Sequence, residues 1–198
     1  MLIGNNGAGK STLLRIISSL MKPTDGTIFF RGASQKENLQ EWLRIMGSMT
    51  HENRLYGNLS AIDNLRLFGT LYGIEELKSK IDQILEKIEL THVAQLPVRN
   101  FSSGMTKRLM IGRMMLCQPE IIILDEPYTG LDLHSFRWFQ NYLNDFHQHG
   151  GTVLMVTHQL ELGLELATRV LVLGQQRIQH DISASELNVD QCSTLLEE

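Results

Sequence analysis

Short apolar runs alternate with segments of helical periodicity along this chain. Six apolar segments predict buried β-strands, at residues 1–3, 27–30, 45–49, 121–124, 152–156 and 170–173. Strands that are apolar throughout are typical of sheets covered on both faces, and they alternate here with helical patterns. The pattern therefore predicts an α/β fold with a largely parallel sheet flanked by helices.

Four segments between these strands have the spacing of helices, at residues 12–20, 75–90, 104–116 and 133–147. In the clearest of them apolar residues recur at steps of three and four, at Leu77, Ile81, Ile84, Leu85 and Ile88. The stretch from about residue 60 to 117 contains no strand pattern, so we expect a mostly helical subdomain inserted in the sheet. We expect one domain over residues 1–198, with no clear element in the polar, acidic tail after residue 183.

Composition narrows the classes of protein that fit. Apolar residues make up 42% and charged residues 20% of the 198 residues, which argues against a disordered chain. The net charge of −4 disfavours nucleic acid as a partner, because it gives no general attraction to a phosphate backbone. No run approaches the roughly 18 apolar residues of a membrane span, and no signal peptide precedes the first glycine. Cys117 and Cys192 lie far apart without metal-type spacing, so we expect idle thiols in a soluble, cytoplasmic protein.

A glycine-rich segment near the start matches the pattern G-x-x-x-x-G-K-[ST], between a strand and an amphipathic helix. Its residues are Gly4, Asn5, Asn6, Gly7, Ala8, Gly9, Lys10, Ser11 and Thr12. Glycines permit torsions that turn several backbone N–H groups toward one point, and the helix adds the positive end of its dipole. Lys10 is placed to reach the outer phosphates of a nucleotide, and the Ser11 hydroxyl to hold Mg²⁺. The alternative is a glycine-rich turn with an exposed lysine.

Two other strands end in residues suited to the same nucleotide. The strand at 121–124 is followed by Asp125 and Glu126, at the edge where open α/β sheets bind ligands. Asp125 is a candidate ligand of Mg²⁺, and Glu126 a candidate catalytic group that orients the attacking water or accepts its proton. The strand at 152–156 leads to His158, a candidate catalytic residue beside the terminal phosphate. The alternatives are a capped turn for the carboxylates and a structural role for the histidine.

In this combination and order, the residues resemble the nucleotide-binding domain of ABC transporters. The stretch at residues 100–108 is similar to the signature loop of that family, which usually runs Leu-Ser-Gly-Gly-Gln. Ser102 and Gly104 stand at matching positions. Ser103 and Met105 depart from the common form. The signature is a serine–glycine turn that opens a helix, so it is an anion site of the same kind as the phosphate loop.

The resemblance spans residues 1 to about 180 and assigns two further positions. Asp132 falls on the aspartate of the loop that follows the Asp-Glu pair, where it adjoins the nucleotide, and His158 falls on the switch histidine. The family implies a head-to-tail dimer, of identical or different subunits, with ATP and Mg²⁺ at the interface. Each ATP then lies between the phosphate loop of one subunit and Ser102 and Gly104 of the other.

This arrangement implies a function in transport. ATP holds the two nucleotide-binding subunits together, and hydrolysis lets them part, so closure of the dimer can drive a separate integral membrane subunit. We therefore expect an ATPase that is peripheral on the cytoplasmic face of the inner membrane. The alternatives from other classes are a non-transport ABC ATPase that acts on ribosomes or DNA, and a regulatory subunit that does not hydrolyse ATP.

Two features depart from the family. His51 stands where the family has the glutamine of its glutamine loop, and it is a third candidate catalytic residue. A histidine there can bind water or Mg²⁺ and adds a pH dependence, or it has only a structural role. Relatives also carry an N-terminal β segment with an aromatic residue that stacks on adenine. Only three residues precede Gly4, so we expect a misplaced start, a fragment, or a looser hold on adenine.

Within the family, the chain is similar to the ATP-binding subunit of the haem exporter of bacterial cytochrome c biogenesis. The similarity rests on the short length, His51, the segment Ser102-Ser103-Gly104-Met105, and residues 159–167 after the switch histidine. ATPase subunits of drug, lipid or polysaccharide exporters share much of this pattern, so the cargo stays open between them.

Overall fold

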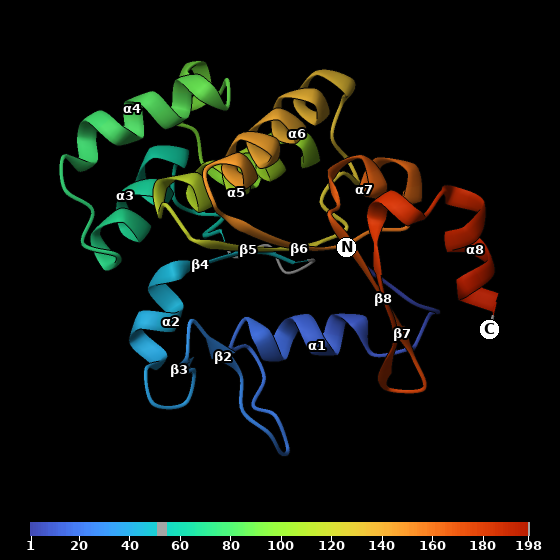
Figure 1. The fold of residues 1–198 in the computed structure, drawn as a ribbon. Coiled ribbons are helices and arrows are strands. Elements are labelled where there is room, and N and C mark those ends of the chain that lie inside the picture. The colour runs from blue at the N-terminus through green and yellow to red at the C-terminus, as the bar shows by residue number, and fades with distance from the viewer. Residues whose placement is uncertain (51–54, 198) are drawn as a thin grey trace.

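The computed structural model describes residues 1–50 and 55–197. Its centre is a six-stranded sheet in which strands distant in sequence lie side by side (Figure 1). The strand order is β4 (Met46–Met49), β5 (Ile121–Asp125), β6 (Thr152–Val156), β1 (Leu2–Ile3), β7 (Arg169–Gly174) and β8 (Arg177–Ser183). The first five strands are parallel, whereas β8 pairs antiparallel with β7. The predicted α/β fold with a largely parallel sheet is confirmed.

Helices cover both faces of this sheet (Figure 1). One face carries α1 (Lys10–Ile17) and α2 (Leu39–Ile45). The other face carries α3 (Ala61–Leu71), α4 (Leu77–Lys87), α5 (Ser103–Leu116), α6 (Leu133–Gln148) and α7 (Leu160–Leu166). α8 (Val189–Glu197) packs against α7 near the β7–β8 hairpin, and short 3-10 turns lie at 91–93, 98–100 and 184–186. Among the described residues, no helix has the length and hydropathy to cross a bilayer.

The core of the sheet is built on β5, whose five residues are all buried. Ile122, Ile123 and Leu124 are fully inaccessible, and their side chains enter the clusters on both faces of the sheet. Each such side chain contributes about 1.5–3 kcal/mol through removal of apolar surface from water. A strand buried on both sides holds its carboxyl end at a fixed depth, which fixes where Asp125 stands.

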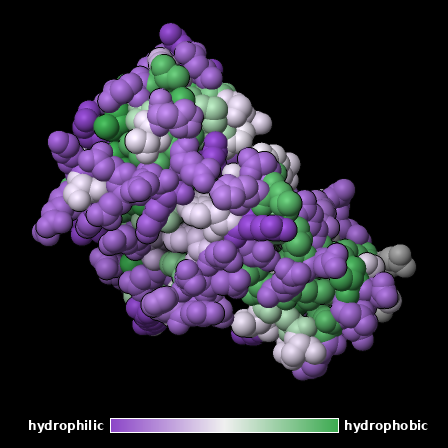
Figure 2. All heavy atoms as spheres, turned by 90° about the horizontal axis from the view of Figure 1, so that it is seen from above, coloured by the Kyte–Doolittle hydropathy of each residue, from purple (hydrophilic) through white to green (hydrophobic). Residues whose placement is uncertain are grey.

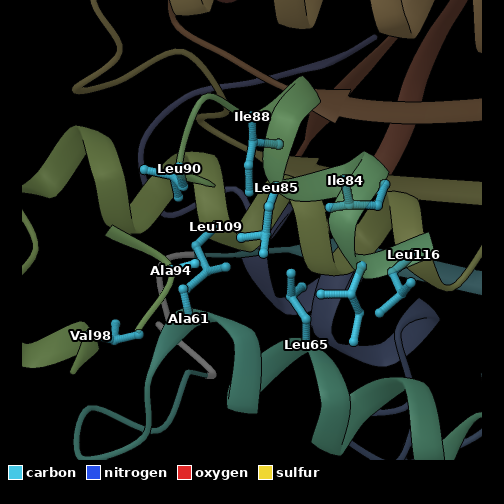
Figure 3. Close-up of a cluster of buried hydrophobic side chains, with 11 residues drawn as sticks. Ala61, Leu65, Ile84, Leu85, Ile88, Leu90, Ala94, Val98, Leu109 and Leu116 are labelled. Carbon is cyan, nitrogen blue, oxygen red and sulfur yellow. The ribbon is translucent and has the colours of Figure 1, made fainter. Parts of the chain in front are cut away.

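A second cluster joins α3, α4 and α5 into a helical layer (Figure 3). Leu65 of α3, Leu85 and Ile88 at the end of α4, and Leu109 of α5 are buried there. α4 approaches α5 closely at Gly112, where a Cβ atom would lie 2.7 Å from Cδ1 of Ile88. Residues 60–117 form helices and short 3-10 turns, and the segment predicted as a helix at 104–116 is α5.

The prediction of a buried strand at 27–30 is wrong. Only β2 (Phe29–Phe30) forms there, and it pairs antiparallel with β3 (Ala33–Ser34) in a separate two-stranded sheet. Phe29 is 65% exposed, so an apolar run here does not mark a core strand. Phe30 instead packs edge-on against Trp42, with ring centroids 6.4 Å apart.

Within the described residues, five helices and strands lie in segments for which the sequence pattern predicts none: α2, β3, α7, β8 and α8. β8 lies at one edge of the sheet and is mostly exposed, and Cys192 is the buried anchor of α8. Figure 2 looks down on the face of the sheet that carries α3 to α7, and it shows polar residues over most of that surface. Apolar residues gather toward the side where α7 and α8 lie. Elements with so few buried side chains leave little apolar periodicity in the sequence.

Candidate functional site

The candidate site forms where β5, β6 and β1 end next to one another (Figure 1). Val156 of β6 is level with Asp125 on one side and with Leu2 on the other, so the three carboxyl ends meet at one depth. A cavity of about 260 Å³ opens there. Its lining consists of Asn6, Gly7, Gly9, Lys10, Ser11, Thr12, Asp125, Glu126, Val156 and His158. Most of the predicted phosphate loop, both carboxylates and the histidine are thus brought together.

The phosphate loop takes a conformation that needs its glycines. Gly7 has φ 83° and Gly9 has φ 103°, in the region that L side chains rarely adopt. A Cβ atom on Gly4 would lie 2.3 Å from the carbonyl oxygen of Leu173 on β7. The loop is therefore pressed against the sheet at its start and turns left-handed before α1.

Lys10 stands at the centre of the loop. Its Nζ donates to the carbonyl oxygens of Gly4 at 2.5 Å and Asn5 at 3.0 Å. The ammonium is therefore held over the loop, close to the backbone that would surround a phosphate. Gly4 and Asn5 contribute through these carbonyls rather than by lining the cavity. Ala8 packs against the core beneath, and its N–H closes a turn on the Asn5 carbonyl.

The first turn of α1 adds backbone donors. The cap residue, Gly9, has no side chain that could accept a hydrogen bond from this turn. The first bond of the helix runs from the Leu13 N–H to the Gly9 carbonyl, so the N–H groups before it have no partner within the helix. Together with the helix dipole and the Lys10 ammonium, they make a site suited to an anion.

Glu126 holds a buried carboxylate beside this anion site. Its Oε1 atom is buried and accepts no hydrogen bond from the residues that the structure describes, and Nε2 of His158 lies 3.7 Å away. The other oxygen, Oε2, accepts a long hydrogen bond of 3.5 Å from the Thr157 hydroxyl. The Glu126 side chain is 15% exposed and that of His158 is 66% exposed. A carboxylate oxygen without a donor at the wall of a polar cavity can accept a hydrogen bond from water bound there.

The backbone at Glu126 is strained. Its φ is 50°, the left-handed region, which costs roughly 1–2 kcal/mol for a residue with a Cβ atom. Its N–H donates to the Val156 carbonyl at 2.9 Å. Strain of this kind persists only where the surroundings fix the backbone, and it occurs at functional sites.

The cavity also fits a magnesium ion. Ser11, in the first turn of α1, and Asp125, at the end of β5, both line it and offer oxygen ligands. Within the described residues, no group of three or more histidine, cysteine, aspartate or glutamate side chains forms a metal cluster. Mg²⁺ is usually held by one or two protein oxygens together with substrate phosphates and water, so the oxygens of Ser11 and Asp125 suit such an ion.

The predicted signature turn lies at the start of α5, and neither Ser102 nor Gly104 is among the described residues that line the cavity. Ser102 is exposed and caps the helix, since its hydroxyl accepts from the Met105 N–H at 3.2 Å. A Cβ atom on Gly104 would lie 3.6 Å from the Gly130 carbonyl, so this turn adjoins the loop between β5 and α6. The signature turn thus lies outside the lining of the chain's own cavity, with Ser102 exposed.

Asp132 caps α6. Its carboxylate accepts from the Ser135 N–H at 2.8 Å, and this hydrogen bond lowers the pKa of Asp132 below its ordinary value. Arg108 and His134 lower this pKa further. His51 lies outside the described residues.

Comparison with known proteins decides the family. The family model described as ABC transporter matches residues 1–129, more than half of the chain. The chain belongs to the ABC transporter family. It is an ATP-binding subunit of the ABC type, with the ATPase fold of that family.

Relatives of this ABC subunit differ in what their names say they transport. Over 163 residues it is 39% identical to the lantibiotic transport ATP-binding protein SrtF of Streptococcus pyogenes, a match that covers 80% of this chain and 67% of the relative. Over 158 residues it is 34% identical to the cytochrome c biogenesis ATP-binding export protein CcmA 2 of Cupriavidus metallidurans, covering 80% and 75%. The ABC assignment is therefore shared, whereas cytochrome c biogenesis stands in the name of only one of these two relatives.

A solved structure of a dimeric ABC cassette shows the same fold. That cassette, in a post-hydrolysis state bound to ADP and Pi, has a TM-score of 0.81 at 25% identity. The match covers 92% of this chain and 84% of that one. ABC cassettes thus form dimers and bind adenine nucleotide.

The ABC subunit holds two residues near Glu126 to which the sequence assigned no role. Thr157 is buried, and its hydroxyl lies between the Glu126 carboxylate and the Gln159 N–H, from which it accepts at 3.1 Å. Lys107 of α5 donates to the Glu126 carbonyl at 3.0 Å. Thr157 precedes His158 directly, which was the available signal. The contact of Lys107 depends on how α5 packs, so no comparable signal exists in the sequence pattern.

Proposed function

We propose that this subunit hydrolyses ATP to ADP and phosphate and so drives export through a separate membrane subunit. The observation that carries the proposal is the cavity lined by the phosphate loop together with Glu126, whose buried Oε1 atom accepts no hydrogen bond from the described residues. An anion site beside a carboxylate that can orient water suits the attack of water on a phosphate.

Each residue of the cavity has a role in this proposal. Lys10 and the N–H groups of the first turn of α1 bind the outer phosphates. Glu126 orients a water molecule in line with the γ-phosphate and takes up its proton. His158, 3.7 Å from Glu126, hydrogen-bonds the terminal phosphate. Ser11 and Asp125 hold Mg²⁺, which would neutralise phosphate charge when bound.

The position of the signature turn supports a dimer in this proposal. Ser102 and Gly104 stand at the start of α5 and do not line the chain's own cavity, so they suit the nucleotide bound to a second subunit. Asp132, at the start of α6, lies next to that interface. The dimer consists of identical or different subunits on the cytoplasmic face of the inner membrane. His51 contributes to the same reaction.

The relatives support two candidate cargoes for this export function, and they differ in their identity to this chain. Haem export for cytochrome c biogenesis is one form, since CcmA 2 is 34% identical. Export of a lantibiotic-like peptide is the other, since SrtF is 39% identical. Co-purification of the membrane subunit, followed by measurement of ATPase stimulation by haem and by such a peptide in liposomes, separates them. Stimulation by neither compound would count against both.

Glu126→Gln tests the ATPase assignment. The amide keeps the shape of the side chain but cannot take up a proton, so hydrolysis should fall by about 10²–10⁴-fold while Mg·ATP binding stays. Size-exclusion chromatography should then show a dimer in Mg·ATP. Glu86→Gln, on the exposed side of α4, is the matched control and should keep the full rate. A Glu126→Gln protein that hydrolyses ATP at the unmodified rate would show that Glu126 has another role.

A further inference from the structure

Lys107 connects the helix that begins at the signature with the backbone of Glu126. It lies on the second turn of α5 and is half-buried. Its Nζ donates to two main-chain carbonyls, at 3.0 Å to Glu126 and at 2.7 Å to Thr129. Both carbonyls belong to the loop between β5 and α6. One ammonium therefore holds the two ends of a four-residue segment, from 126 to 129.

This segment is where the backbone of the site is strained. Glu126 has φ 50°, and the direction in which its carboxylate points depends on that torsion. On one side the Glu126 N–H donates to Val156 of β6. On the other side its carbonyl accepts from Lys107. The peptide groups on both sides of the Glu126 side chain are thus held by different elements, and Lys107 supplies the contact from α5.

A half-buried ammonium needs such partners. Burial lowers the pKa of Lys107, and the charge of Glu126 partly offsets this effect. Removal of the ammonium would leave the two carbonyls without this donor, and each loss of a charge-assisted hydrogen bond weakens the hold on the turn. The carboxylate of Glu126 would remain in place chemically, with more freedom in its direction.

We propose that Lys107 is a positioning residue for Glu126, which keeps the turn at 126–129, with its left-handed torsion at Glu126, in the conformation that aims the carboxylate into the cavity. The inference rests on the proposed role of Glu126 in ATP hydrolysis. Lys107 is not among the described residues that line the cavity, so it does not contact the phosphates. It acts on the rate of the chemical step and leaves nucleotide binding unchanged.

Lys107→Met tests this, because methionine keeps much of the length and apolar body of the side chain but has no donor. The kcat for ATP should fall about 10- to 100-fold, the loss typical of a misplaced catalytic group, while KM and the Kd for Mg·ATP change less than about twofold. Lys107→Arg keeps a charged donor and should restore most of kcat. Lys87→Met, at an exposed lysine on α4, is the matched control and should behave as the unmodified protein.

A second comparison keeps the test sharp if Lys107→Met also lowers thermal stability. In the Glu126→Gln background, Lys107→Met should give no further loss of the residual rate, because the group it positions is already inactive. Equal fold-losses in both backgrounds, a rise in KM with unchanged kcat, or failure of Lys107→Arg to restore the rate would each overturn the proposal. Failure of the proposed function has a different signature, since the unmodified chain would then not hydrolyse ATP at all.

Discussion

The two helix N-termini assigned to phosphate differ in how their backbone donors are satisfied. α1 begins after Gly9, which has no acceptor to offer, and its first turn faces a cavity. α5 begins after Ser102, whose hydroxyl already accepts the Met105 N–H. The N–H groups at the start of α1 therefore need an acceptor from a ligand or from water. At the start of α5, the Ser102 hydroxyl already satisfies one N–H group.

This difference has a consequence for the order of binding. The open N–H groups in the first turn of α1 can bind an anion without losing an internal hydrogen bond, so this turn can bind phosphate in a single subunit. At the signature turn, a phosphate would replace the Ser102 hydroxyl as the acceptor of a backbone N–H group. Exchanging one acceptor for another gains little net free energy. Nucleotide is therefore expected on α1 first, with the signature turn of a second subunit added afterwards.

Replacement of Lys10 gives the largest expected effect on this comparison. Lys10→Ala removes the ammonium from the phosphate loop, and hydrogen bonds to charged groups are worth about 1.5–3 kcal/mol. Mg·ATP should bind about 10- to 100-fold more weakly, as measured by isothermal titration calorimetry at protein concentrations where the chain is monomeric. Lys22→Ala, at an exposed lysine beyond α1, should leave the affinity unchanged. A loss below threefold for Lys10→Ala would mean that the open N–H groups alone hold the phosphates.

Paired glycine substitutions sharpen the contrast, because the two glycines are needed for different reasons. Gly9 has φ 103°, so Gly9→Ala should cost about 1–2 kcal/mol and lower the melting temperature by about 2–8 °C. Gly104 carries no such torsion, and a Cβ atom there would meet the Gly130 carbonyl at an ordinary 3.6 Å. Gly104→Ala should therefore keep or raise the melting temperature, since alanine favours helix.

The readout that separates the two glycines is dimer formation. In the Glu126→Gln background with Mg·ATP, Gly104→Ala should reduce the dimer while the monomer still binds nucleotide, because the added methyl group stands where the phosphate would approach. Gly9→Ala should weaken nucleotide binding by the monomer itself. A Gly104→Ala protein that unfolds at lower temperature than Gly9→Ala would reverse the comparison.

The sequence predicts well what local chemistry decides. Apolar runs identify β5, β6 and β7, because most side chains of these strands are apolar and at least partly buried. The phosphate loop is equally local, since its glycines and Lys10 lie within one short segment. α2 was missed because tertiary contacts define it: Trp42 is buried, and its Nε1 donates to the Ile17 carbonyl at 2.9 Å.

The site itself was predicted in its residues but not in its geometry. That Asp125, Glu126 and His158 lie at one edge follows from where their strands end. The left-handed backbone at Glu126 does not follow, because glutamate rarely adopts it and nothing in the sequence marks it. The bond from Lys107 to that backbone depends on the packing of α5 over β5, which no periodicity encodes.

Removal of the serine cap gives the smallest expected effect. It tests the N-terminus of α5, where the Ser102 hydroxyl already satisfies a backbone donor. Ser102→Ala takes away the acceptor of the Met105 N–H, which should cost about 1 kcal/mol and lower the melting temperature by about 2–4 °C. Ser102→Gly should cost only a few tenths of a kcal/mol.

Ser60, which caps α3 in the same way, gives the matched control, since its loss should destabilise the chain without affecting the dimer. If Mg·ATP restores the melting temperature of Ser102→Ala only at concentrations where the dimer forms, the nucleotide of a second subunit has taken over the role of the missing hydroxyl. If it restores this temperature in the monomer, the signature turn contacts nucleotide within its own chain, and the assignment of α5 to a second subunit is wrong.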